Sequence, residues 1–194
     1  MQGGVPETEQ DDLRLIARVT GHDDHKAFAT LVMRHQGAVR TVLRRLAKGD
    51  SALADDLAQA TLLRAYTTLR SFNGTAHFRT WLYRIACNEF FQYRRLARVS
   101  REVPLEEHEE QVLPVEVEAR SGPDLSIDLE RALASLSDAE REAIIVCYYA
   151  DMSHSEAASM LNCALGTLKS HVQRGRQKLS VYLSAWAPSV TEVS

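Results

Sequence analysis

Residues 72–101 read FNGTAHFRTWLYRIACNEFFQYRRLARVSR and combine positive charge with aromatic side chains. They hold six arginines, one acid (Glu89) and about half of the chain's aromatic residues. Apolar residues recur at helical spacing, which predicts a helix from about Ala76, and Asn73-Gly74 is typical of a turn before it. Because positive charge follows a phosphate backbone and flat rings stack on unpaired bases, the pattern suits single-strand binding. A core helix with a solvated arginine face explains the pattern equally well.

The sequence before this stretch predicts a bundle of helices that packs with it. Residues 1–10 are polar and are expected to be disordered. Three amphipathic helices are then expected, at residues 11–19, from Asp24 to near Gly49, and from Ser51 to Leu69. Together with the arginine-rich helix they predict an all-α domain over residues 11–99.

Metal or disulfide chemistry has little support in the sequence. His22, Asp23, Asp24 and His25 allow a metal site, but an N-cap at Asp24 for the next helix is the favoured interpretation. The chain has three cysteines, which are odd in number, far apart and in no metal-ligand spacing: Cys87, Cys147 and Cys163. This usage predicts a reduced, cytoplasmic protein. No signal peptide and no apolar run of membrane-spanning length are evident.

The third expected helix presents four residues away from its apolar side: Asp55, Asp56, Gln59 and Leu63. An exposed acidic patch beside an apolar residue suits contact with a protein partner. A plain solvated face is an equally good explanation of these residues alone.

An acidic segment separates this domain from the rest of the chain. Residues 101–130 contain ten acids, two bases and three prolines. Such a composition predicts an extended, self-repelling linker, which we place at residues 100–126. The linker is either a solubilising spacer or a segment that occupies a cationic nucleic-acid channel.

A second helical domain is predicted over residues 127–186, followed by a tail at 187–194. Its signals are two capping boxes, Ser137 with Glu140 and Ser153 with Glu156. A short helix to Leu161, a brief break and a longer basic helix from Leu165 to Ala185 form a helix-turn-helix pattern.

The last helix is strongly basic, because no acid occurs between Glu156 and Glu192. Lys169, Ser170 and Gln173 are expected to face outward in its N-terminal half, where a recognition helix reads base edges. DNA binding is the favoured interpretation, and a helical pair that binds only protein is the alternative.

These features together resemble the extracytoplasmic-function (ECF) sigma factors, the small two-domain promoter-recognition subunits of bacterial RNA polymerase. The resemblance covers about Leu13 to Leu183 and rests on three segments: Asp55–Thr61, Phe78–Asn88, and Gly166–Ser170 with Arg174–Arg176. The first is similar to the family's polymerase-binding helix, the second to its promoter-melting segment and the third to its recognition helix.

The resemblance implies a fold and binding roles. The fold would be all-α, with a sigma-2-like bundle and a sigma-4-like helix-turn-helix joined by the acidic linker. The core polymerase would contact Asp55, Asp56, Gln59 and Leu63. The minus-ten element would be melted and bound, with one base flipped into a pocket, by Phe72, Asn73, Gly74, Trp81, Arg84, Asn88, Arg94 and Arg95. The minus-thirty-five element would be bound by Thr167, Lys169, Ser170, Gln173, Arg174, Arg176 and Lys178.

Further partners follow from the same resemblance: promoter DNA, core RNA polymerase, and a membrane-anchored anti-sigma factor that keeps the protein inactive. No enzymatic activity, cofactor or metal is expected. Three residues depart from the family pattern: Gln92, Ala164 and Gly175. A glycine in place of the usual alanine at position 175 is expected to cost about 1 kcal/mol of helix stability.

Two other classes of protein are the alternatives. A stand-alone repressor or activator would use only the helix-turn-helix and would leave residues 72–101 unexplained. A DNA-processing enzyme is disfavoured because the sequence has no glycine-rich phosphate loop, no clustered metal-ligand carboxylates and no nucleophile motif.

Overall fold

A computed structural model describes residues 7–100 and 125–184 of the chain, and within these ranges the elements are helical, with no strand. The chain divides into two compact units. The first comprises Met1–Glu102 with Ile145–Ser153, and the second comprises Val103–Ile144 with His154–Ser194. Most of the predicted linker, residues 101–124, lies outside the described residues, as do the chain ends at 1–6 and 185–194.

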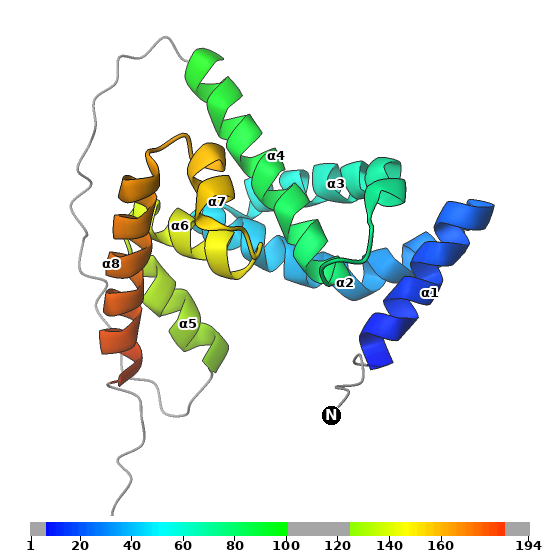
Figure 1. Cartoon of the computed structure of the whole chain (residues 1–194), viewed down its shortest axis with the longest axis horizontal. Helices are drawn as coiled ribbons and strands as arrows, with labels where there is room; N and C mark the ends of the chain where they lie inside the picture. The colour runs from blue at the N-terminus through cyan, green and yellow to red at the C-terminus, as the bar shows by residue number, and fades with distance from the viewer. Residues whose placement is uncertain (1–6, 101–124, 185–194) are drawn as a thin grey trace, which may run out of the picture. The chain divides into compact units, whose positions relative to one another are not determined.

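The first unit contains the predicted helical bundle (Figure 1). Its elements are α1 (Glu7–His22), α2 (His25–Leu46), α3 (Ser51–Thr68), the short 3-10 helix η1 (Leu69–Ser71) and α4 (Phe78–Ser100). Helix α2 lies against α1, α3 and α4, and α3 also lies against α4. The predicted N-cap is confirmed, because the Asp24 carboxylate accepts a hydrogen bond from the Ala27 backbone N–H at 3.0 Å.

Helix α3 turns a different side to the core from the one its leucines suggest. The large apolar residues Leu53, Leu62 and Tyr66 are only half-buried. The buried residues are mostly small: Ala54, Leu57, Ala58, Thr61 and Ala65. Because α3 packs against both α2 and α4, small side chains on this side allow close approach of the helix axes.

A buried polar contact attaches α1 to α2. Asp12 is only 5% exposed and accepts hydrogen bonds from Arg34 at 2.5 Å and from His35 at 2.8 Å. A buried carboxylate needs such partners to offset the loss of water. The His35 ring also meets the Phe78 ring edge-on at 5.3 Å. Thus α1 and α2 brace the start of α4.

The second unit contains the helix-turn-helix pattern. Its helices are α5 (Leu125–Ala134), the first part of α6 (Asp138–Tyr148), α7 (His154–Met160) and α8 (Leu165–Ser184). The predicted capping box is confirmed at the start of α6: the Ser137 backbone N–H donates to Glu140 at 3.1 Å and the Glu140 N–H to the Ser137 hydroxyl at 3.4 Å. Helices α7 and α8 pack together across a short turn.

Candidate functional site

The loop between η1 and α4 is shaped by Asn73. Its side-chain carbonyl accepts hydrogen bonds from the backbone N–H of Thr75 at 3.1 Å and from the Thr75 hydroxyl at 2.8 Å. Gly74 has a φ of +73°, which favours glycine. Both Asn73 and Gly74 are exposed, so the amide –NH₂ of Asn73 lies at the surface of a well-defined turn.

An aromatic cluster lies directly beside this loop. The Trp81 ring stacks on Phe78 at 5.6 Å and meets Phe72 at 5.5 Å. Phe78 is buried, whereas Phe72 and Trp81 are half-buried. The cluster therefore combines a core anchor with two rings that retain accessible surface on which a base could stack.

Helix α4 aligns three of the predicted residues on one side. At 3.6 residues per turn, Asn88 and Arg95 fall within about 20° and 40° of the direction of Trp81, and Arg84 lies within about 60°. Arg94 lies about 100° from Arg95, and its guanidinium lies over the Phe91 ring at 5.1 Å. The structure thus brings Trp81, Asn88 and Arg95 into a stripe and leaves Arg94 beside it. The half-buried Arg84 instead donates hydrogen bonds to the backbone carbonyls of Ala150 at 2.9 Å and Asp151 at 2.6 Å.

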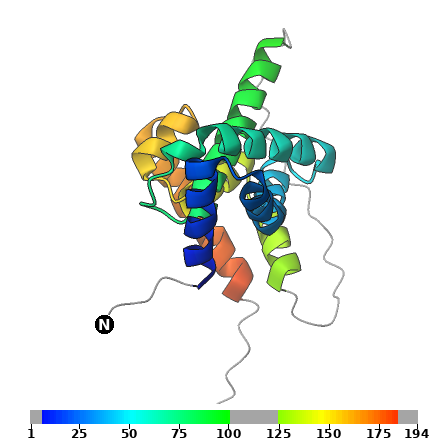
Figure 2. The same cartoon turned by 90° about the vertical axis from the view of Figure 1, so that its right-hand side faces the viewer.

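Glu89, the acid of α4, is paired with an arginine of α3. Glu89 accepts a hydrogen bond from Arg64 at 3.2 Å. The C-terminal part of α4 extends beyond α3 in both views (Figures 1 and 2). Leu96 in this part of the helix is 71% exposed. This end of α4 is therefore accessible within its own unit.

The predicted polymerase-binding residues separate into two environments. Asp56, Gln59 and Leu63 are exposed, and Leu63 retains 70% of its surface. Asp55 is half-buried and forms an ion pair with Arg40 of α2 at 3.0 Å. Asp55 therefore joins α3 to α2, while the other three form the outward surface.

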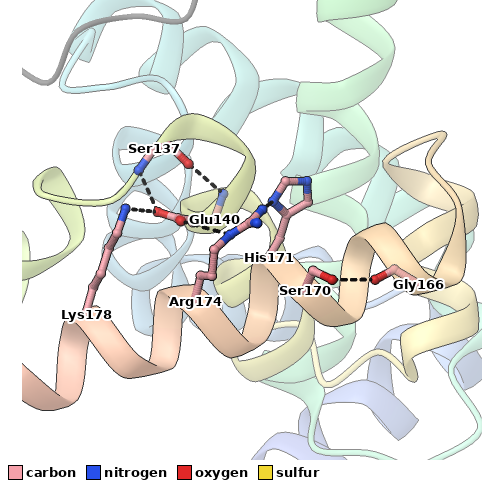
Figure 3. Close-up of polar contacts among 7 residues, drawn as sticks. All are labelled: Ser137, Glu140, Gly166, Ser170, His171, Arg174 and Lys178. Atoms are coloured by element: carbon pink, nitrogen blue, oxygen red, sulfur yellow. Dashed lines mark hydrogen bonds and ion pairs between the residues drawn. The ribbon is translucent and has the colours of Figure 1, made fainter.

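Helix α8 presents the predicted base-reading residues outward. Thr167, Lys169, Ser170 and Gln173 are all exposed. The Ser170 hydroxyl donates to the backbone carbonyl of Gly166 at 3.0 Å, so its proton is already engaged within the helix (Figure 3). Lys169 and Arg176 form no ion pair with any acid in the described parts of the chain.

Two other cations of α8, Lys178 and Arg174, contact the buried acid Glu140, which the sequence pattern indicates only as a capping residue. Glu140 accepts a hydrogen bond from Lys178 at 2.7 Å, and Arg174 lies 3.5 Å away (Figure 3). Burial by itself raises the pKa of Glu140, but the hydrogen bonds from Lys178 and Ser137 outweigh it, so the pKa lies below its ordinary value. Glu140 is therefore ionised at neutral pH.

His171 completes this group. Its Nδ1 lies 2.9 Å from the Arg174 guanidinium. Burial, followed by the positive charge of Arg174, lowers the pKa of His171. The imidazole is accordingly neutral near pH 7 and accepts the hydrogen bond from Arg174 through Nδ1 (Figure 3).

A cluster suited to a metal ion was sought among the described residues. They contain no group of three or more His, Cys, Asp or Glu side chains placed to hold a metal ion. Burial raises the pKa of the Cys87 thiol to about 12, which keeps it protonated. Within residues 7–100 and 125–184, no helix has the length and hydropathy to cross a membrane.

Comparison with protein families gives two matches that coincide with the two helical regions. The model described as "Sigma-70 region 2" matches residues 31–99, and that described as "Sigma-70, region 4" matches residues 126–179. The first match includes the loop, the aromatic cluster and α4, and the second includes α6 to most of α8.

Curated relatives match nearly the whole chain. The RNA polymerase sigma factor NccH of Alcaligenes xylosoxydans xylosoxydans is 31% identical over 178 residues, covering 88% of this chain and 94% of that protein. The ECF RNA polymerase sigma-E factor of Salmonella typhimurium strain LT2 is 32% identical over 179 residues, covering 87% and 92%.

Solved structures give the same result. The sigma factor RpoE in complex with the anti-sigma factor NepR from Bartonella quintana matches at a TM-score of 0.51 and 32% identity, covering 82% of this chain and 98% of that one. CnrH in complex with the cytosolic domain of CnrY matches at a TM-score of 0.50 and 28% identity, covering 90% and 98%.

Proposed function

The chain belongs to the ECF sigma factors of the sigma-70 family, and from this premise we propose that it directs core RNA polymerase to promoters and opens them. Sigma factors bind core polymerase and promoter DNA and are transcription initiation factors rather than enzymes. In this proposal the first unit binds the polymerase and the minus-ten element, and α8 reads the minus-thirty-five element.

One observation carries the opening step: an exposed, shaped loop adjoins stackable rings and a cationic stripe. The loop offers the amide of Asn73, the cluster offers Phe72 and Trp81, and the stripe offers Asn88 and Arg95. An extruded base needs stacking and hydrogen bonds to offset an unpairing cost on the order of a few kcal/mol. The residues for both, Phe72, Asn73 and Trp81, lie in the loop before α4 and in its first turns.

The loop geometry allows a sharp test of Asn73. Replacement by alanine removes both the carbonyl that shapes the turn and the amide that would meet a base. Asn73→Ser and Asn73→Asp retain an acceptor for Thr75, since serine and aspartate support similar turns. Both lose the amide –NH₂, and only the aspartate adds charge.

We expect holoenzyme with either Asn73→Ser or Asn73→Asp to occupy a promoter that wild-type holoenzyme transcribes, but to open it about tenfold less. A tenfold change corresponds to about 1.4 kcal/mol, within the range of one base contact. Permanganate footprinting measures opening, and a template with mismatched minus-ten bases should restore transcription. Normal opening by Asn73→Ser alongside failure of Asn73→Ala would show that Asn73 only shapes the loop.

The polymerase contact is assigned to the exposed residues of α3, Asp56, Gln59 and Leu63. An acidic and polar rim around one large apolar side chain is a composition typical of a protein interface. Asp55 supports this surface through its ion pair with Arg40.

At the minus-thirty-five element, Lys169 and Gln173 are proposed to contact base edges and Arg176 to contact phosphate. Thr167 and Ser170 flank them on the same exposed half of α8.

An anti-sigma factor is proposed to hold the protein inactive. This proposal is supported by the matched RpoE structure, which contains the anti-sigma factor NepR. A membrane-anchored partner and a cytoplasmic location for this chain are proposed together, because CnrY is present in its structure as a cytosolic domain.

A further inference from the structure

We propose that Glu140 is a positioning residue for DNA recognition: its carboxylate holds Lys178 and Arg174 and thereby sets how α8 lies on α6. The inference rests on the proposed reading of DNA by α8. It assigns to Arg174 and Lys178 an internal role in place of the phosphate contacts that their charge suggests.

Contacts from α8 and from the start of α6 hold the Glu140 carboxylate in place. The Glu140 side chain is 5% exposed, and its two carboxylate oxygens face different cations, Oε2 toward Lys178 and Oε1 toward Arg174 (Figure 3). Oε2 also accepts from the Ser137 backbone N–H, so the carboxylate cannot turn without breaking the cap of α6. The acid is thus fixed to α6 and its cations are fixed to α8.

A steric contact lies in the same place. A Cβ added to Gly175 would lie 2.9 Å from Ile144 Cγ1 and 3.5 Å from the backbone carbonyl oxygen of Glu140. Residues 174, 175 and 178 of α8 therefore meet residues 140 and 144 of α6 in one patch. The missing side chain of Gly175 permits the close approach that brings Lys178 to Glu140.

Helical geometry separates these cations from the outward ones. Lys178 lies about 180° around α8 from Lys169, and Arg174 about 140° from it. Arg176 lies within about 20° of the direction of Lys169. One flank of the helix is therefore neutralised by Glu140, while the other retains cations that form no ion pair with the described acids.

The energetic argument favours an internal role. If Lys178 turned to a phosphate, Glu140 would remain buried without its closest cation. Removing one partner of such a pair destabilises the protein because the buried carboxylate loses part of its compensation, and the half-exposed position of Lys178 reduces this cost. A phosphate contact by Lys178 would thus leave Glu140 less compensated, and this loss would offset the binding energy gained from the phosphate. A phosphate contact by Arg176 would carry no such loss.

Salt dependence distinguishes the two roles. Binding of the full-length chain to a fluorescent, random-sequence DNA duplex should be measured across a salt series for Lys178→Gln and Arg176→Gln. The slope of log K against log salt is negative, and each lost phosphate contact lowers its magnitude by about 0.9. We expect this decrease for Arg176→Gln and an unchanged slope for Lys178→Gln. An equal decrease for both variants would overturn the inference.

The positioning role has an independent measurement. Lys178→Met should make hydrogen exchange about twofold to fivefold faster in peptides of α6 and α8. The effect is expected to be modest because Lys178 is half-exposed and solvent screens its interaction with Glu140. Arg176→Met should leave these peptides unchanged, and Lys178→Arg should restore protection. The double variant Glu140→Gln/Lys178→Met should exchange no faster than Lys178→Met alone, since it leaves no unpaired acid.

The DNA-binding and hydrogen-exchange measurements distinguish failure of this inference from failure of the proposed function. Additive effects of Glu140→Gln and Lys178→Met on exchange would overturn the positioning role, whichever way DNA binding comes out. Absence of duplex binding by the wild-type chain, with coupled exchange intact, would refute DNA reading by α8 and keep the Glu140 anchor.

Discussion

Replacing Gly175 with alanine should lower the stability of the folded protein, although alanine is the better helix former. In an exposed helix interior this change stabilises by about 1 kcal/mol. At position 175 the new methyl group would lie 2.9 Å from Ile144 Cγ1 and 3.3 Å from its Cδ1. Ile144 is only 4% exposed and belongs to the core around Leu133 and Leu136, so it has little room to move.

The balance of these terms sets the magnitude. Overpacking a filled core costs about 1–3 kcal/mol, against the gain of about 1 kcal/mol in helix propensity. We therefore expect a net loss of about 1 kcal/mol, which corresponds to about fivefold faster hydrogen exchange in α8. The shift should also loosen the contact between Lys178 and Glu140.

Gly37 of α2 provides the matched control. It is exposed, lies inside a helix, and an added Cβ there would meet nothing within 4 Å. Gly37→Ala should therefore slow exchange in α2, while Gly175→Ala accelerates exchange in α8, both measured by mass spectrometry on the full chain. Slower exchange in α8 of a folded Gly175→Ala protein would refute the close-packing argument.

Reversing charge with Asp56→Arg should weaken core-polymerase binding in a pull-down while circular dichroism stays unchanged; equal binding would remove α3 from the interface. Lys169→Ala should relax sequence preference at a cost of about 1–3 kcal/mol, whereas Arg176→Ala should weaken all duplexes alike, as competition binding would show. The lowered pKa of Glu140 predicts stabilisation that is complete above the ordinary Glu value of 4.5 and is lost as pH falls through the lowered value. Acid titration of α8 exchange tests this, and Lys178→Met should flatten the curve.

Local signals in the sequence were sufficient for the helices and for the starts that carry a capping signal, whereas the first helix, expected at residues 11–19, spans Glu7–His22. The N-cap at Asp24 and the capping box of Ser137 with Glu140 depend only on residues within one turn, and both are confirmed. The order of the three family segments identified the fold class, because it depends on side-chain types along the chain. These features require no knowledge of how one helix lies on another.

Contacts between helices could not be predicted from the sequence. Asp55 and Asp56 are neighbours with the same chemistry, yet only Asp55 reaches Arg40 across the interface with α2. Gly175 was interpreted as a weak point in a helix, whereas its proximity to Ile144 gives it a packing role. Both outcomes depend on the register and distance between two helices, and these are set by packing rather than by periodicity.

The unbroken length of α4 has a consequence for spacing. The helix runs from Phe78 to Ser100 without interruption, so Trp81 and Arg95 are held about 21 Å apart along its axis. This is the axial rise of about six stacked base pairs at 3.4 Å each. In the proposed promoter-opening role, a rigid helix of this kind would set a fixed spacing along the DNA. Inserting one residue between Trp81 and Arg95 would turn Arg95 by about 100° and lengthen the helix by about 1.5 Å. The number of bases between the captured position and the upstream duplex would thereby be a property of one helix.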